Sequence, residues 1–169
     1  MDTWQIVVKT VAGEFSDIPT LADLIRVTLR LLVAGVLGGL LGYERERKGK
    51  SAGLRTHMLV SIGAALFVLI SLQAGAASES DALSRVLQGI VAGIGFLGAG
   101  SIIKSGHREG PTGLTTAAGI WLTAAIGVAA GMGQIALAML STLLALIILA
   151  LLPKIPSSHE QRGNDGTDA

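Results

Sequence analysis

The chain has 169 residues, of which 50% are hydrophobic and 15% are charged. A soluble domain carries about 25% charged residues, so this composition indicates a protein embedded in a lipid bilayer. The net charge of +1 gives no reason to expect a nucleic-acid partner, and the absence of cysteine excludes disulfides and thiolate metal sites.

Residues 1–23 are predicted to form an N-terminal extracytoplasmic or interfacial segment. They hold more acidic than basic residues, so no cleaved signal peptide is expected. Residues 3–11 are apolar but too short to span, and either lie at the membrane interface with Trp4 or form a loosely ordered tail. A helix is predicted to start after them, with Thr20 as its N-cap and Asp23 three residues further on.

The apolar stretches predict an all-α integral membrane protein, a compact bundle of about five transmembrane helices over residues 24–152. A span needs ~20 residues, and the uncharged stretch between Gly110 and Lys154 is long enough for two spans with a turn at 131–134. Residues 153–169 are predicted to be a disordered cytoplasmic tail. The predicted spans are Leu24–Tyr43, Thr56–Ser78, Val86–Ile103, Leu114–Gly131 and Ile135–Leu152, with polar loops at Ala74–Arg85 and Lys104–Pro111.

Arg30 falls inside the first predicted span. Its side chain either snorkels to the outer interface or pairs within the bundle. Arg26, one turn earlier, marks that interface and favours snorkelling.

The loop Tyr43–Thr56 holds two carboxylates, Glu44 and Glu46, and five cations, which are Arg45, Arg47, Lys48, Lys50 and Arg55. Basic loops stay in the cytoplasm, which predicts an N-out, C-in topology. A topology signal alone explains the lysines and arginines but does not require the carboxylates. The charges of the loop either form internal Glu–Arg pairs or contact anionic headgroups.

Glycines recur at four-residue spacing, which lets helix backbones approach closely in lipid. The pairs are Gly35/Gly39, Gly38/Gly42, Gly89/Gly93 and Gly127/Gly131. The third span is the richest in glycine, and we expect it at the centre of the bundle or at a homo-oligomer contact. Its candidate functional residues are Gly93, Gly95, Gly98 and Gly100. Residues 93–98 also match a dinucleotide fingerprint, but the strand and the acidic residue that the fingerprint needs are missing.

Three polar residues inside the membrane part are further candidates. Gln88 is predicted to donate an interhelical hydrogen bond, and Thr115 and Thr116 to satisfy free backbone groups at a helix start. In the alternative interpretation the threonines and Ser101 line a small hydrated cavity near the cytoplasmic face. Packing is the favoured interpretation.

Four linked motifs resemble those of the MgtC/SapB membrane proteins. The resemblance covers roughly Leu31–Leu152. The motifs are Glu44–Glu46 with Ala52–His57, Ser61–Phe67, Gly93–Gly100, and Gly113–Ala118 with Ile120 and Trp121.

This resemblance implies a multi-pass protein of the bacterial inner membrane with a role in magnesium homeostasis and stress adaptation. Some family members act by restraining the F-type ATP synthase, which implies a membrane-protein partner in addition to the lipid bilayer. Virulence-type members have Gly-Leu-Asn-Thr in place of Gly113–Thr116 and a cysteine in place of Leu122. Many also have a soluble domain after the spans, so we expect a short, SapB-like form here.

The favoured function is a membrane-embedded regulator or partner protein, and not an enzyme. There is no Walker or phosphorylation motif, and the three histidines lack convincing Ser or Asp partners. Glu44, Arg45, Glu46, Arg55 and Thr56 are predicted to form the cytoplasmic clamp of the bundle. The alternative is a small Mg²⁺ or other cation transporter or channel subunit. No cofactor is expected, and no carboxylate inside the last three spans supports a Mg²⁺ site.

Overall fold

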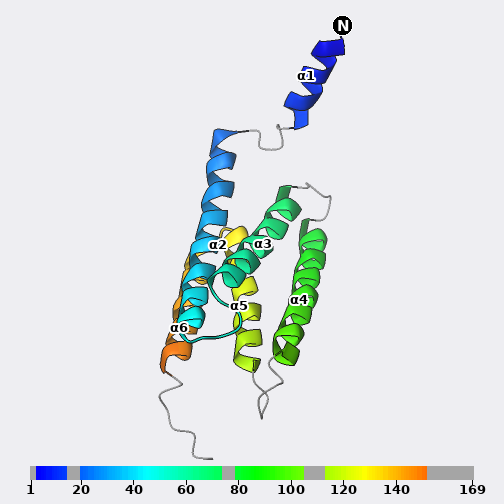
Figure 1. The fold of residues 1–169 in the computed structure, drawn as a ribbon. Helices are drawn as coiled ribbons and strands as arrows, with labels where there is room; N and C mark the ends of the chain where they lie inside the picture. The colour runs from blue at the N-terminus through cyan, green and yellow to red at the C-terminus, as the bar shows by residue number, and fades with distance from the viewer. Residues whose placement is uncertain (1–2, 15–19, 74–78, 105–112, 152–169) are drawn as a thin grey trace, which may run out of the picture.

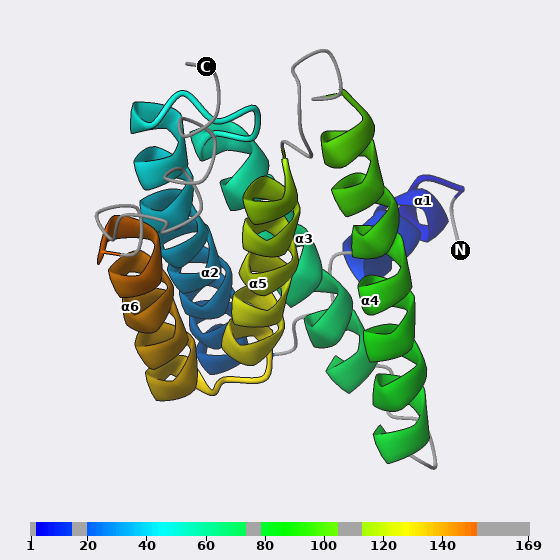
Figure 2. The ribbon, with the colours of Figure 1, turned by 90° about the horizontal axis from the view of Figure 1, so that it is seen from below.

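The computed structural model describes residues 3–14, 20–73, 79–104 and 113–151, and these residues form six helices and no strand. The helices are α1 (Thr3–Glu14), α2 (Leu21–Arg47), α3 (Leu54–Gln73), α4 (Glu79–Lys104), α5 (Leu114–Gly131) and α6 (Ile135–Leu151). Helices α2 to α6 lie side by side and alternate in direction, with α6 and α4 at opposite edges (Figures 1 and 2). The α2–α3 turn therefore lies at one end of the bundle, and the α5–α6 turn at the other.

Four of these helices are long and apolar enough to cross a membrane, and α6 adds a shorter apolar helix. The predicted all-α membrane bundle is confirmed. The alternation of directions is the one that five spans require, while the N-out, C-in orientation stays a prediction. Helix α1 touches no other described helix and stands beyond the start of α2 (Figure 1). Thr3–Glu14 is helical rather than loosely ordered, and its position at a membrane interface stays a prediction.

The helix ends differ from the predicted bounds where charged residues continue a helix. The structure begins α4 at Glu79, seven residues before the predicted start, so residues 79–85 of the predicted loop are helical. The rest of that loop, the predicted loop after Lys104 and the predicted tail 153–169 lie outside the described residues. Hydropathy marks only the apolar part of a helix, because polar side chains at the interface do not end the backbone hydrogen bonds. The predicted bounds of α5 are confirmed, as is the N-cap of α2. The Thr20 hydroxyl accepts a 3.1 Å hydrogen bond from the Asp23 N–H.

Helix α3 is held between α2 and α5 by glycine contacts. A Cβ atom at Gly38 would lie 2.7 Å from the carbonyl oxygen of His57, and one at Gly127 would lie 2.2 Å from that of Ser61. One at Gly131 would lie 2.7 Å from the carbonyl oxygen of Ala65. Only glycine allows backbones to approach this closely, so the predicted role of small residues is confirmed in these two helices.

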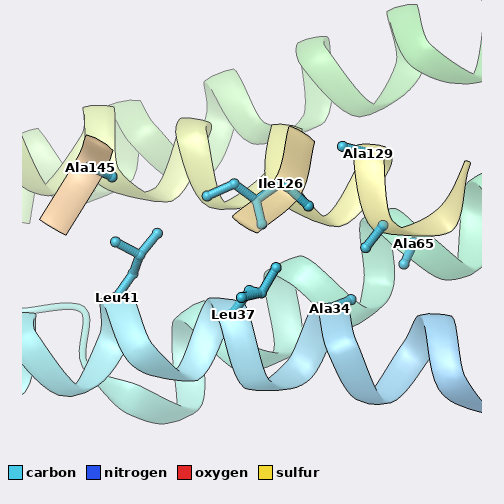
Figure 3. Packing of buried hydrophobic residues seen from close by; sticks show 9 residues of the cluster. Ala34, Leu37, Leu41, Ala65, Ile126, Ala129 and Ala145 are labelled. Atoms are coloured by element: carbon cyan, nitrogen blue, oxygen red, sulfur yellow. The ribbon is translucent and has the colours of Figure 1, made fainter. Parts of the chain in front are cut away.

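The buried apolar core lies between α2, α5 and α6, and α3 contributes Ala65 to it. Figure 3 shows small and branched side chains from these helices facing one another. The residues labelled there are Ala34, Leu37, Leu41, Ala65, Ile126, Ala129 and Ala145. Because many of them are alanine, the helices pack closely without large side chains between them.

Helix α4 lies at the edge of the bundle, so its predicted central position is wrong (Figure 2). Among the described helices it contacts only α5 and α3, and 6% of its span is buried against 50% for α5. The glycine faces of α2 and α5 reach α3 instead. The prediction of a homo-oligomer contact on α4 is left untested by this arrangement.

Candidate functional site

The end of α2 carries a buried ion pair. Only 2% of the Arg45 side chain is exposed, and its Nε donates to Oε2 of Glu44 at 2.5 Å. The other carboxylate oxygen, Oε1, lies 2.7 Å from Nζ of Lys48. A buried guanidinium without a partner costs several kcal/mol, so Glu44 is needed where it stands. The predicted Glu–Arg pairing is present, but it lies on the last turn of α2 and not in a loop, because α2 continues to Arg47.

Lys48 extends this ion-pair network to the last helix. Its ammonium group also donates to the carbonyl oxygen of Leu149, near the end of α6. Cations close to the C-terminal carbonyls of a helix stabilise it, because the helix dipole places partial negative charge there. Lys48 therefore connects the end of α2 to the end of α6.

Glu46 closes the turn between α2 and α3. Its Oε2 accepts a 2.8 Å hydrogen bond from the backbone N–H of Leu54, the first residue of α3. A carboxylate is favourable at a helix N-terminus, where backbone N–H groups are free and the dipole is positive. Gly53 leaves room for it, since a Cβ atom there would lie 2.6 Å from the same oxygen. Gly49, with φ of 64°, lets α2 end just before this turn.

His57 lies next to this turn and is fully buried. Its Nδ1 is 2.9 Å from the carbonyl oxygen of Gly53, four residues earlier. A Cβ atom at Gly119 of α5 would lie 3.6 Å from its Nε2, so α5 passes closely over the ring. Sequence reasoning did not choose His57 as a site residue, because its described partner is a backbone carbonyl. Its position four residues after Gly53 was the available signal.

We define the charged cap as Glu44, Arg45, Glu46, Lys48 and His57, together with the N-terminus of α3. The structure brings together three predicted site residues in it, Glu44, Arg45 and Glu46. Arg55 and Thr56, which were assigned to the same clamp, are exposed on the first turn of α3. Within the described residues no group of three or more His, Asp or Glu side chains is placed to hold a metal ion.

The remaining predicted candidates lie apart from the charged cap, on α4 and α5. Gln88 is exposed and makes no interhelical hydrogen bond to a described residue, against the prediction. A Cβ atom at Gly93, Gly95 or Gly100 would meet no atom within 4 Å, whereas Gly98 is buried against Ala117 of α5. Thr115 is exposed and Thr116 buried, which separates the two threonines. The hydroxyl of Ser101 donates to the carbonyl oxygen of Gly98 within α4.

At the end of the bundle away from the charged cap, Arg30 connects α2 to the C-terminus of α5. Its Nη1 donates to the carbonyl oxygen of Gly131 at 2.9 Å, across 101 positions of sequence. The contact lies within the bundle, which is the alternative that the sequence favoured less. A guanidinium at the C-terminus of α5 satisfies a free carbonyl and complements the helix dipole.

A bundle of apolar helices, packed through glycine and closed at one end by buried charges, defines a multi-pass helical membrane protein. The chain belongs to the MgtC family, whose model matches residues 31–158. The resemblance stated from the sequence is thereby confirmed. No solved structure matches the chain.

Three curated relatives show how far the similarity extends. Protein SrpB of Synechococcus elongatus is 43% identical over 137 residues, covering 76% of this chain and 75% of SrpB. The putative magnesium transporter YhiD of Escherichia coli K12 is 40% identical, covering 72% of this chain and 58% of YhiD. Protein MgtC of Salmonella typhimurium is 44% identical, covering 73% and 51%. The chain thus spans between half and three quarters of the length of these relatives.

Proposed function

We propose that this protein is a membrane-embedded regulator in the bacterial inner membrane, and that it acts through a partner protein in magnesium homeostasis and stress adaptation. Membership of the MgtC family supports the link to magnesium, as does similarity to YhiD, which is named as a magnesium transporter. The partner is a second membrane protein, and the F-type ATP synthase is the candidate that the family resemblance implies.

The open face of α4 is the observation that carries this proposal. An apolar groove of about 640 Å³ runs between α3 and α4, and Gly63, Gly89 and Gly93 are among the residues that line it. Apart from the backbone of its own helix turn, no atom of the described residues lies within 4 Å of a Cβ position at any of these three glycines. Glycine lowers the stability of a helix by about 1 kcal/mol relative to alanine. Close contact with a helix of a partner protein would offset that loss of stability. Small residues of this kind are typical of helix–helix contacts in membranes.

Direct transport of Mg²⁺ is the second candidate, favoured by similarity to YhiD, which is named as a magnesium transporter. Mg²⁺ requires near-octahedral oxygen ligands, usually one or two carboxylates with several waters. Glu44 is engaged by Arg45 and Lys48, and Glu46 by the N-terminus of α3. These engagements speak against their use as ligands and favour the regulator.

The two candidates separate in liposomes that contain the purified full chain under a Mg²⁺ gradient. A regulator gives no saturable Mg²⁺ uptake above protein-free liposomes. Specific, saturable uptake would overturn the proposal in favour of transport.

The partner contact is tested by Gly93→Leu in cells that depend on this protein for growth at low magnesium. Leucine fills the groove and should abolish growth at normal protein level. Ala99→Leu adds similar bulk at another exposed position of α4 and should leave growth intact. Equal growth of the Gly93→Leu and Ala99→Leu variants would show that the groove is not needed for function.

A further inference from the structure

A second cavity lies at the end of the bundle opposite the charged cap. It has a volume of about 520 Å³ and lies between the first turns of α2 and the last turn of α3. The first turns of α2 continue past the α5–α6 turn, so this part of α2 has neighbours on fewer sides (Figure 1). The residues lining the cavity are Asp23, Arg26, Val27, Arg30, Leu69, Leu72 and Gln73.

Arg30 brings a fixed positive charge to the cavity wall. Its Nη1 is held by the carbonyl oxygen of Gly131, and no carboxylate among the described residues pairs with it. Gly133 leaves room for the guanidinium, since a Cβ atom there would lie 2.5 Å from Nη2. A guanidinium has five N–H donors, and the described contact uses one of them. Arg30 is thus anchored in position with donors still to share.

Asp23 does not neutralise both arginines of the cavity. Its Oδ1 accepts from Nη1 of Arg26 at 2.6 Å, and its Oδ2 accepts from the hydroxyl of Thr20 at 2.6 Å. One carboxylate therefore faces two guanidinium groups, which leaves the lining residues with one net positive charge. Gln73 adds an amide that donates or accepts.

The rest of the lining is apolar, and so is the surface beside it. Leu69 and Leu72 form a wall of the cavity, while Leu21 and Ile25 are exposed on the same part of α2. Cationic donors next to apolar side chains at the end of a membrane bundle match the boundary between headgroups and acyl chains.

We propose that this cavity binds a phosphate oxyanion, supplied by the phosphodiester of a monoanionic phospholipid. Arginine is the preferred side chain for phosphate because its planar fork donates two parallel hydrogen bonds. A cation meets repulsion from Arg26 and Arg30, and an apolar ligand leaves their donors unpaired. Inorganic phosphate shares the oxyanion chemistry, but it does not use the apolar wall.

The proposal is tested with the purified full chain in a neutral detergent. Dioctanoyl-phosphatidylglycerol is titrated while the thermal unfolding midpoint is followed, because a ligand that binds the folded state raises that midpoint. Dioctanoyl-phosphatidylcholine and sodium phosphate are titrated in separate arms. We expect a saturable rise with phosphatidylglycerol and a smaller one with phosphatidylcholine.

The variants assign the binding to this cavity. Arg26→Gln should weaken phosphatidylglycerol binding about tenfold while retaining the fold, since 58% of the Arg26 side chain is exposed. Gln73→Leu should weaken it severalfold, which provides a second variant without a charge change. Arg55→Gln removes an exposed cation from the other end of α3 and should bind like the unmodified chain.

The arms also identify the source of the oxyanion. Phosphate binding as tight as that of the lipid, and equally sensitive to Arg26→Gln, would overturn the lipid in favour of the free anion. Equal binding by the Arg26→Gln, Gln73→Leu and unmodified chains would overturn the site itself. An equal loss of phosphatidylglycerol binding in Arg55→Gln would also overturn the site, because the lipid would then bind to exposed cations without specificity.

Discussion

The carboxylate of Glu46 caps the helix that begins at Leu54, eight residues further along the chain. Most helix caps come from a residue next to the first turn, but here the preceding helix supplies one. The α2–α3 turn is therefore closed by a charge-assisted hydrogen bond between the two helices that it connects.

Replacement of Glu46 tests this cap. Glu46→Ala should lower the free energy of unfolding by about 1 kcal/mol, because a helix N-terminus loses its acceptor and its favourable charge. Glu46→Gln keeps an oxygen acceptor and should lose less. Unfolding is measured in detergent micelles, with Lys50→Ala, an exposed position of the same turn, as a control that should change little. A loss as large in Lys50→Ala as in Glu46→Ala would contradict the role of the cap.

The buried pair of Glu44 and Arg45 makes a different prediction. Arg45→Met should cost about 3 kcal/mol, because it removes one partner of a pair of which Arg45 is almost fully buried. Glu44→Gln combined with Arg45→Met should cost clearly less than the sum of the two single changes. A double-mutant cycle measures this coupling. Strict additivity would show that the two side chains do not stabilise one another.

Two glycine positions allow a matched comparison of close packing. Gly127→Ala should destabilise the bundle by about 3 kcal/mol, since its Cβ atom would lie 2.2 Å from a carbonyl oxygen of α3. Gly93→Ala should be neutral or stabilising by up to about 1 kcal/mol, because its Cβ position is open and alanine favours the helix. Thermal unfolding of both purified variants decides the matter. The opposite order would mean that the α3–α5 contact is looser than these distances indicate.

A second glycine pair separates backbone strain from the Arg30 contact. Gly49 and Gly133 both have positive φ, 64° and 82°, so alanine should cost about 1 kcal/mol at either position. Gly133→Ala should cost more, since its Cβ atom also meets the Arg30 guanidinium, whereas that of Gly49 meets nothing within 4 Å. Comparing the unfolding midpoints of the two variants isolates that contact. Equal midpoints would show that Arg30 moves aside freely.

Much of the architecture followed from hydropathy and small-residue spacing. The predicted bounds of α5 were right because glycines with positive φ, Gly113 and Gly133, lie just before and just after this charge-free helix. The position of α4 was not predictable in the same way. Lipid gives apolar side chains no preference for the bundle interior. An apolar, glycine-rich helix therefore has the same sequence pattern whether it lies at the centre of the bundle or at its edge.

The charged cap was only partly predictable. Charge density left Glu–Arg pairing open as one of two roles for the loop charges, and with five cations in the stretch it did not indicate that Glu44 pairs with Arg45. The contacts of Glu46 with Leu54, Lys48 with Leu149 and Arg30 with Gly131 end on backbone atoms. Every residue has a backbone carbonyl, and nearly every one has a backbone N–H. The identity of the accepting or donating residue therefore does not predict these contacts.

The hydrogen bond between Arg30 and Gly131 also sets an order for assembly in the cell. During synthesis α2 enters the membrane long before the ribosome has made α5. The Arg30 guanidinium is therefore without its acceptor, the Gly131 carbonyl oxygen, until α5 has been made. Until then it is most stable near the headgroups, which we expect to hold α2 in a shallower position in nascent chains. Chains truncated before Gly131 should therefore leave Leu21 more accessible to a membrane-impermeant label, introduced through Leu21→Cys, than complete chains do. Equal labelling would mean that α2 reaches its final depth without α5.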